Sequence, residues 1–207
     1  MQNRVNPFGE IIETKARGLW MGNRGHIHNL NCEIVRSYKL KAWITCKLEF
    51  KGRKREIMAP NLYTELFFLD EATAFAAGHR PCFECRREDY NKFKTAWLKG
   101  NPGYKFTAKT SIQDIDKILH DERMNKDGFK RTHEENNSDL PDGTFITIDN
   151  NAFLIFNKRM YLWSPSGYKK YKSFTAGKSA VLTPESIVNA FRAGYVPQMS
   201  IGESMLQ

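Results

Sequence analysis

The feature that most constrains this chain is a pair of cysteines, Cys82 and Cys85, separated by two residues and preceded by Pro81. Two thiolates at this spacing can ligate one tetrahedral metal ion, and the proline restricts the path of the chain into the pair. Positive charge nearby favours the thiolate form of a cysteine, and the same stretch carries three arginines: Arg80, Arg86 and Arg87. We interpret the pair as half of a structural Zn²⁺ site, which needs further ligands from elsewhere in the chain.

Three upstream residues are candidates for the remaining ligands. His28 and Cys32 are separated by three residues in a glycine-punctuated segment, and Cys46 follows on a predicted strand. Cys46 shares a strand face with apolar residues, so it is either a small buried hydrophobe or a ligand. The other two histidines of this region, His26 and His79, are interpreted as polar or DNA-facing residues.

The pattern along the chain predicts an α+β fold with an N-terminal zinc-stabilised module over residues 1–100. Apolar and polar residues alternate over residues 41–50, which predicts a half-buried strand. Lys51 and Gly52 then form a predicted turn, and residues 53–58 are the predicted returning strand of a hairpin. A strand over 63–69 is followed by two helices, over 71–77 with Asp70 as N-cap and over 86–98.

The remaining residues are predicted to form a helix, a polar loop and a C-terminal α/β part. Ser111 is the predicted N-cap of a helix that runs to about Arg123, and residues 125–143 are polar and predict an exposed loop. Residues 144–207 hold a predicted β-meander over 144–163, a flexible basic loop with exposed tyrosines over 164–172, and a helix over 184–193 capped by Thr183.

The charge of the chain favours a polyanionic partner. The formal net charge is +9, and residues 36–55 hold eight Lys or Arg against one acid, Glu49. Aromatic residues interleaved with these cations are typical of surfaces that stack on bases and neutralise phosphates. We expect a nucleic acid, DNA in preference to RNA, to contact these basic residues: Arg53, Lys54, Arg55, Arg80, Arg86, Arg87, Lys169 and Lys170.

The run EATAFAAGHRPCFEC, within residues 67–90, resembles the helix and cysteine pair of the metal-binding domain of the Ada family of DNA alkylation-repair proteins. The upstream run GNRGHIHNLNC, residues 22–32, is similar to the opening of small Ada-like modules. The resemblance implies a module in which four ligands bind one zinc ion and the domain contacts DNA. It favours a role in the repair or sensing of modified DNA. Ada itself carries an upstream C-x3-C pair for methyl transfer, and this chain has no such pair.

Three other functions use the same residues. A metal-dependent nuclease could be built from the carboxylates of Glu65, Asp70 and Glu71, since paired carboxylates can hold Mg²⁺. A nucleobase deaminase matches the downstream Pro-Cys-x-x-Cys but requires an upstream His-x-Glu, which the chain lacks. A non-catalytic protein-interaction module would leave the basic face merely solvated.

Hydropathy bears on where the chain resides. It has no run of about 20 apolar residues, the length that a membrane span requires. Its first residues lack the apolar run of a secretory signal, so we expect a cytoplasmic protein without a membrane partner. In that reducing compartment, four cysteines favour metal ligation or free thiols over disulfides.

Overall fold

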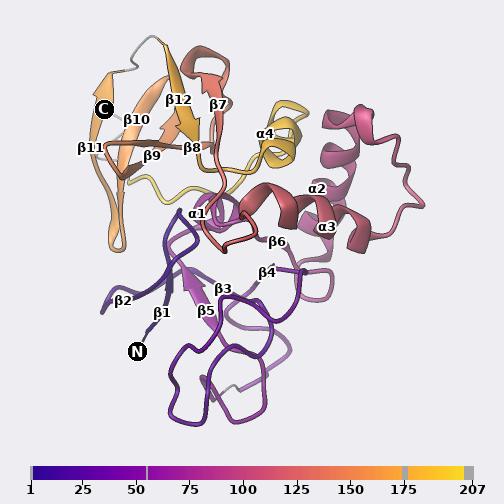
Figure 1. Cartoon of the computed structure of the whole chain (residues 1–207), viewed down its shortest axis with the longest axis vertical. Coiled ribbons are helices and arrows are strands. Elements are labelled where there is room, and N and C mark those ends of the chain that lie inside the picture. The colour runs from indigo at the N-terminus through magenta and orange to yellow at the C-terminus, as the bar shows by residue number, and fades with distance from the viewer. Residues whose placement is uncertain (1, 55, 174–176, 203–207) are drawn as a thin grey trace.

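The chain forms two sheets and four α-helices, in a computed structural model that describes residues 2–54, 56–173 and 177–202. In Figure 1 the N-terminal sheet lies below the C-terminal sheet, with α1 (Glu71–Ala76) between them. The mixed α and β content agrees with the predicted fold class. None of the helices in these ranges is both long enough and apolar enough to cross a membrane.

The N-terminal sheet is built from short strands in the order β2-β1-β5-β3-β4-β6. Its parallel and antiparallel pairs are mixed, because β1 pairs with β5 and β4 with β6 in parallel while the other neighbours are antiparallel. The strands are β1 (Gln2–Val5), β2 (Ile11–Glu13), β3 (Trp20–Asn23), β4 (Ile44–Cys46), β5 (Leu66–Phe68) and β6 (Arg80–Pro81).

The strands β3, β4 and β6 lie side by side in the sheet, with one end of the group near Cys46 and the other near Trp43. Cys46 of β4 lies opposite Met21 of β3, and the amide of Cys82 donates to the carbonyl of Thr45 at 2.9 Å. At the opposite end, the amide of Arg80 donates to the carbonyl of Trp43 at 3.1 Å. Each of these strands therefore connects two distinct regions of the molecule, one around Cys46 and one around Trp43.

The C-terminal sheet has the order β11-β10-β9-β8-β12-β7, and all its neighbouring strands are antiparallel. The meander predicted over residues 144–163 is confirmed by three consecutive strands. The strands are β7 (His133–Asn136), β8 (Phe145–Ile148), β9 (Asn151–Phe156), β10 (Arg159–Ser164), β11 (Gly167–Ser173) and β12 (Lys178–Val181).

Two helices, α1 and α3, begin at residues whose side chains cap them. The Asp70 carboxylate accepts from the amide of Thr73 at 2.8 Å, and Ser111 accepts from the amide of Gln113. These two contacts confirm two of the three predicted N-caps, Asp70 and Ser111. The other helices are α2 (Arg87–Gly100), α3 (Ile112–Arg123) and α4 (Glu185–Arg192), with 3₁₀ turns over Pro102–Tyr104 and Asn137–Asp139.

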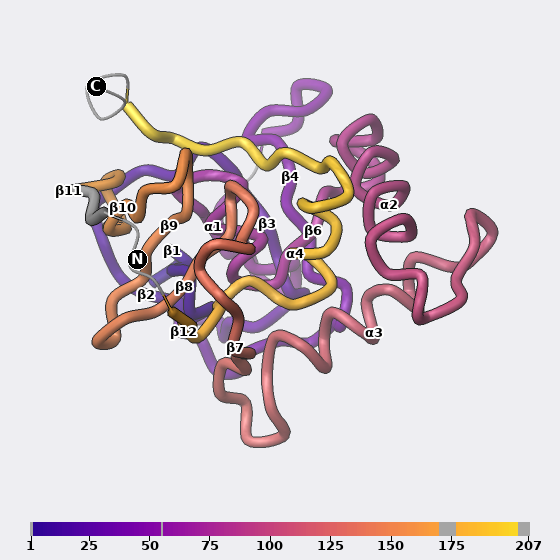
Figure 2. Tube along the Cα trace, turned by 90° about the horizontal axis from the view of Figure 1, so that it is seen from above, coloured from indigo at the N-terminus to yellow at the C-terminus, as the bar shows by residue number. Residues whose placement is uncertain are grey.

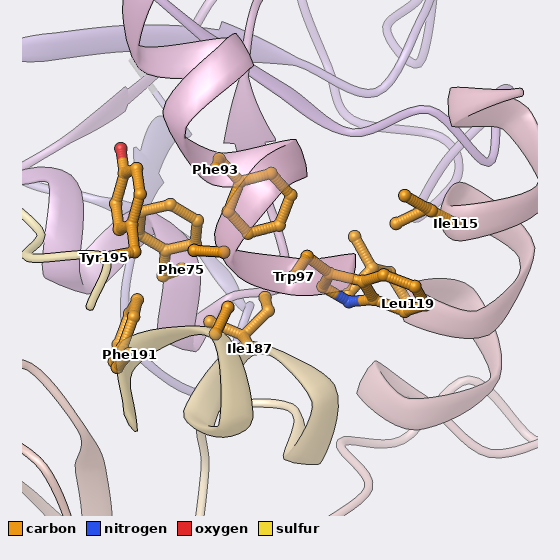
Figure 3. Close-up of a cluster of buried hydrophobic side chains, with 10 residues drawn as sticks. Phe75, Phe93, Trp97, Ile115, Leu119, Ile187, Phe191 and Tyr195 are labelled. Carbon is orange, nitrogen blue, oxygen red and sulfur yellow. The ribbon is translucent and has the colours of Figure 1, made fainter. Parts of the chain in front are cut away.

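An aromatic core joins the helices to each other. Phe75 of α1, Trp97 of α2, Leu119 of α3 and Ile187 of α4 belong to one buried cluster (Figure 3). Burial of one large apolar side chain stabilises a fold by roughly 1.5–3 kcal/mol, so this cluster is a major source of stability. In the view of Figure 2, α2 and α3 lie together on one side of the molecule.

A second buried cluster connects α1 to the C-terminal sheet. Ala72 and Ala76 of α1 pack with Phe145 of β8, Leu154 of β9 and Tyr161 of β10. Small alanine side chains let the helix approach the sheet closely. The segments predicted as an N-terminal module and a C-terminal part therefore share apolar contacts through α1.

Four local predictions are wrong. Residues 53–58 form no strand: Lys51 and Gly52 do make the predicted turn, with φ of +51° and +65°, but the chain then continues without sheet pairing in its described part. The predicted polar loop over 125–143 contains β7, because β7 pairs with β12 from outside the segment. The predicted basic loop over 164–172 is mostly β11, since β10 supplies its pairing partner. Helix α4 is capped by Pro184, while the hydroxyl of Thr183 instead accepts from the amide of Phe145.

Candidate metal centre

Three cysteines converge at one end of the N-terminal sheet. The Sγ atoms of Cys46, Cys82 and Cys85 lie within 4.8 Å of one another, and each residue is less than a tenth exposed. A tetrahedral zinc ion with Zn–S bonds of about 2.3 Å needs its sulfurs about 3.8 Å apart. The spacing and the donor chemistry therefore fit a bound transition-metal ion such as zinc, with these three residues as its ligands.

The local backbone places the three thiols. Cys46 ends β4, and Cys82 follows β6, which pairs in parallel with β4. The chain then turns back, since the amide of Glu84 points to the Cys82 sulfur at 3.4 Å and the amide of Arg86 donates to the Cys82 carbonyl at 3.1 Å. Amide donors to a ligand sulfur stabilise its thiolate and orient it toward the metal.

The thiols interact electrostatically in a way that a cation would relieve. Hydrogen bonds from the Cys46 and Cys85 thiols lower the pKa of Cys82, while the resulting thiolate raises the pKa of Cys46 and of Cys85. A divalent cation beside the three sulfurs favours the thiolate form of each of them.

An apolar shell surrounds the cysteines. Met21 packs against them in the core cluster, and Ile44, Phe50, Tyr63 and Phe67 cover its edges. Such a shell limits solvent access to a bound metal. Cys46 proves to be both a buried residue and a member of the group, so the two interpretations of its role in the sequence are compatible.

His28 and Cys32 lie away from this group. The Nδ1 atom of His28 is 2.6 Å from the Thr64 hydroxyl, and its Nε2 atom is 3.3 Å from the Ala59 carbonyl. The thiol of Cys32 faces the Met58 carbonyl at 4.0 Å. Among the described residues, the structure therefore brings together three of the five candidate ligands.

Arg80 does not face a polyanion, and this prediction is wrong. Its side chain is buried and makes two hydrogen bonds of 2.7 Å to the two carboxylate oxygens of Asp116 on α3. Such a bidentate pair satisfies the guanidinium within the protein.

Arg86 is likewise an internal residue and no phosphate contact. It pairs with the carboxylate of Glu71, lies 2.9 Å from that of Asp89, and its guanidinium packs 3.9 Å from the Trp20 ring. Glu71 lies 15 residues from Arg86 in the sequence, and Asp116 lies 36 residues from Arg80. Local charge patterns could not reveal them.

Other predicted nucleic-acid contacts are exposed. Arg53, Lys54, Arg87 and Lys169 all lie on the surface, with Arg53 paired to the carboxylate of Glu84. Arg55 lies outside the described residues, and so does the side chain of Lys170, whose backbone belongs to β11.

An exposed aromatic residue that was not predicted to be functional lies beside the metal centre. Phe83 lies between the two cysteines of the pair and is 51% exposed, with the Arg87 guanidinium 4.4 Å from its ring. Phe50 has the cations of Lys51 and Arg53 at 5.2 and 5.5 Å from its ring. The signal was available, since a residue between two closely spaced ligands has little room to turn into the core.

The carboxylates considered for a magnesium site are engaged in other contacts. Glu65 accepts from the amide of Met58 at 2.8 Å. Asp70 caps α1 and also accepts from Tyr168 and Ser200, and Glu71 binds Arg86, Tyr195 and Gln198. Through these contacts the three carboxylates stabilise the fold.

His79 does not face a DNA partner, and Tyr168 is less exposed than the predicted loop over 164–172 requires. His79 is fully buried against Trp43, and the hydroxyl of the half-buried Tyr168 donates to Asp70 at 2.7 Å.

Comparisons of the chain with protein-family models, with curated proteins and with solved structures found no match.

Proposed function

We propose that this chain is a zinc-containing nucleic-acid-binding protein whose metal centre holds a DNA-binding surface in place. The observation that carries the proposal is the position of exposed cations and aromatics directly around the three buried cysteines. This surface, the basic rim, consists of Phe83 and the half-buried Phe50 together with the exposed Lys47, Lys51, Arg53, Lys54 and Arg87.

The basic rim is tied to the metal centre by short connections. Phe50 packs at the edge of the cysteine cluster, and Phe83 lies between two of its members. The ion pair between Arg53 and Glu84 joins the two loops of the rim. A bound Zn²⁺ supplies a cross-link between β4 and the loop before α2, so the shape of the rim depends on it.

The rim has the chemistry that nucleic acid requires. Lys and Arg neutralise backbone phosphates and release counterions, whereas exposed aromatic rings stack on bases. Three cysteines leave one position of a tetrahedral zinc ion to a ligand from outside this group. The resemblance of residues 67–90 to the Ada module favours DNA as the partner, and a role in repair or sensing of modified DNA.

The test combines metal content with DNA affinity. Native mass spectrometry of the purified, reduced chain is expected to show one zinc ion, and fluorescence anisotropy is expected to show binding to a 20-base-pair duplex that weakens with salt. Arg87→Met should weaken binding, whereas Lys117→Met, an exposed single-charge change on α3 outside the rim, should not. Absence of zinc, or equal effects of the two variants, would contradict the proposal.

A further inference from the structure

A cavity of about 640 Å³ lies at the other end of β3, β4 and β6 from the cysteines. Besides the exposed Arg36, cationic side chains from three separate parts of the chain line it: Arg24 after β3, Arg123 at the end of α3, and Lys130 from the loop that follows α3. Trp43, just before β4, lies among them. This volume is in the range of small-molecule sites, about 300–1,000 Å³.

Two guanidinium groups pack on the same tryptophan. The Cζ atoms of Arg24 and Arg123 lie 3.7 and 3.8 Å from the Trp43 ring, and each arginine is only 2% exposed. Cation–π contact of this kind contributes on the order of 1–2 kcal/mol. That gain is smaller than the cost of keeping an unpaired charge out of water.

The hydrogen-bond acceptors of these arginines are neutral. Arg24 donates to the Gly9 carbonyl at 2.9 Å and to His79 at 3.3 Å. Arg123 donates to the carbonyls of Gly78 and Lys41 at 3.0 and 2.7 Å, and its Nη2 lies 2.9 Å from the ring nitrogen of His120. None of these contacts supplies the negative charge that the two guanidinium groups require.

Lys130 adds a third cation. Its ammonium group donates to the Ala76 carbonyl, and bridge pairing between Met124 and Lys130 closes the loop that brings it into the cavity. Burial, reinforced by the charges of Arg123 and Arg24, lowers the pKa of Lys130 to about 7, and burial lowers the pKa of Arg24 to about 9.

The nearest carboxylates are committed to other partners. Asp116 attracts Arg123 electrostatically but is held by both hydrogen bonds from Arg80. Glu10 lines the cavity, yet it is exposed and accepts from the amide side chain of Asn6. Within the described residues, the cavity therefore carries an excess of positive charge.

Polar hydrogens in the same place also lack partners. In the described part of the chain, the Nε1 atom of Trp43 and the Nε atom of Arg123 are buried without a hydrogen bond. Buried donors of this kind cost about 1–3 kcal/mol each unless an acceptor reaches them. A ligand rich in acceptor oxygens would satisfy these donors and the three cations together.

We propose that this cavity binds the phosphate group of a small phosphorylated molecule. A phosphate dianion matches three cations better than a single carboxylate does, and its oxygens suit the N–H forks of arginine. The apolar lining by Phe8, Ile11 and Ile34 leaves room for the organic part of the ligand. The phosphates of a DNA duplex lie on a wide backbone and could not reach these buried groups.

A glycine is required where the cavity meets α1. Gly78 has φ of +84°, and a Cβ atom there would lie 2.5 Å from the Cδ atom of Arg123. The backbone therefore makes space for this guanidinium to lie on Trp43, at a position that also needs left-handed geometry.

The experiment measures thermal unfolding of the purified full chain with added phosphate. Inorganic phosphate, adenosine monophosphate and ribose 5-phosphate are titrated at pH 7, with sodium chloride matching the ionic strength of each sample. A ligand at about a hundredfold excess over its Kd should raise the Tm by about 5–10 °C. A larger rise with either organic phosphate identifies an esterified ligand, and equal rises identify free phosphate; both results support the site.

Two single-charge variants decide where phosphate binds. Lys130→Met removes the charge, keeps most of the length of the side chain, and should lose most of the phosphate-induced rise in Tm. Lys51→Met on the basic rim should retain that rise. No rise beyond that in sodium chloride, or an equal rise in wild type and Lys130→Met, overturns the proposal. Loss of the response in Lys51→Met alone would assign phosphate to the basic rim and would also overturn it.

Discussion

The metal centre and the Trp43 cavity have opposite electrostatic needs. At one end of β3, β4 and β6, three buried thiols require a cation before all can ionise. At the other end, buried cations are held by neutral acceptors and require an anion. Elsewhere in the same interior, Arg80 and Arg86 are paired directly with carboxylates. An uncompensated buried group is therefore a better sign of a ligand site than a buried charge as such.

The largest expected effect follows from breaking the metal centre. Cys82→Ser should lose zinc, and structural zinc sites contribute many kcal/mol to folding. We expect a loss of about 5 kcal/mol or more, which lowers the Tm by roughly 10–20 °C for a chain of this size. Thermal unfolding and metal analysis check this, with Cys32→Ser as the control that keeps its zinc. Full zinc retention in Cys82→Ser would contradict the assignment of the three cysteines as the metal site.

A compensated cation provides the next test. Asp116→Ala leaves Arg80 buried without a carboxylate, and breaking such a pair costs about 3–5 kcal/mol. Asp114→Ala, which breaks the exposed pair with Lys117, should cost no more than about 1 kcal/mol. Urea denaturation measures both values. Similar costs for the two variants would show that burial does not distinguish these ion pairs.

Removal of an uncompensated cation should instead raise the free energy of unfolding. The folded-state pKa of Lys130 is about 7, below its usual 10.5, so the unfolded chain binds more protons between these values and this contribution to stability rises with pH. Without phosphate, Lys130→Met should therefore be more stable than wild type by up to about 5 kcal/mol below pH 7. That difference should shrink toward pH 10. Urea denaturation at several pH values checks the trend, and a pH-independent difference would contradict it.

The smallest expected effects concern the basic rim. Loss of one phosphate contact through Arg87→Met should reduce the slope of log affinity against log salt by about 1. Phe83→Ala should cost about 1–3 kcal/mol of binding if a base stacks on the ring, with little change in that slope. Anisotropy titrations at four salt concentrations separate the two effects. An unchanged affinity in both variants would show that the basic rim does not bind nucleic acid.

Local signals in the sequence predicted much of the fold but only part of either site. Helix caps such as Asp70 and Ser111 act within three residues, and Cys82 and Cys85 lie on one short loop, so their roles can be read locally. The partner of Arg80 lies 36 residues away on α3, and strand β11 exists because β10 pairs with it. Such contacts depend on the tertiary fold.

The residues of the Trp43 cavity were even harder to predict from the sequence. Arg24, Trp43, Arg123 and Lys130 come from four separate segments and form no motif. Each alone has an ordinary interpretation as a surface cation or a core aromatic. Their common property, positive charge without a nearby free carboxylate, exists only after β3, β4 and α3 have packed together.

The arrangement of β3, β4 and β6 has a consequence for how the two sites respond to each other. Only two residues separate Trp43 from Cys46, across β4. The same number separate His79, which contacts Trp43, from Cys82, across β6, so both strands connect the two sites. Thermodynamic reciprocity then applies: any factor by which zinc changes the affinity for phosphate is the factor by which phosphate changes the affinity for zinc. Cooperativity through this strand trio would make the zinc occupancy of the protein depend on the concentration of a phosphorylated small molecule.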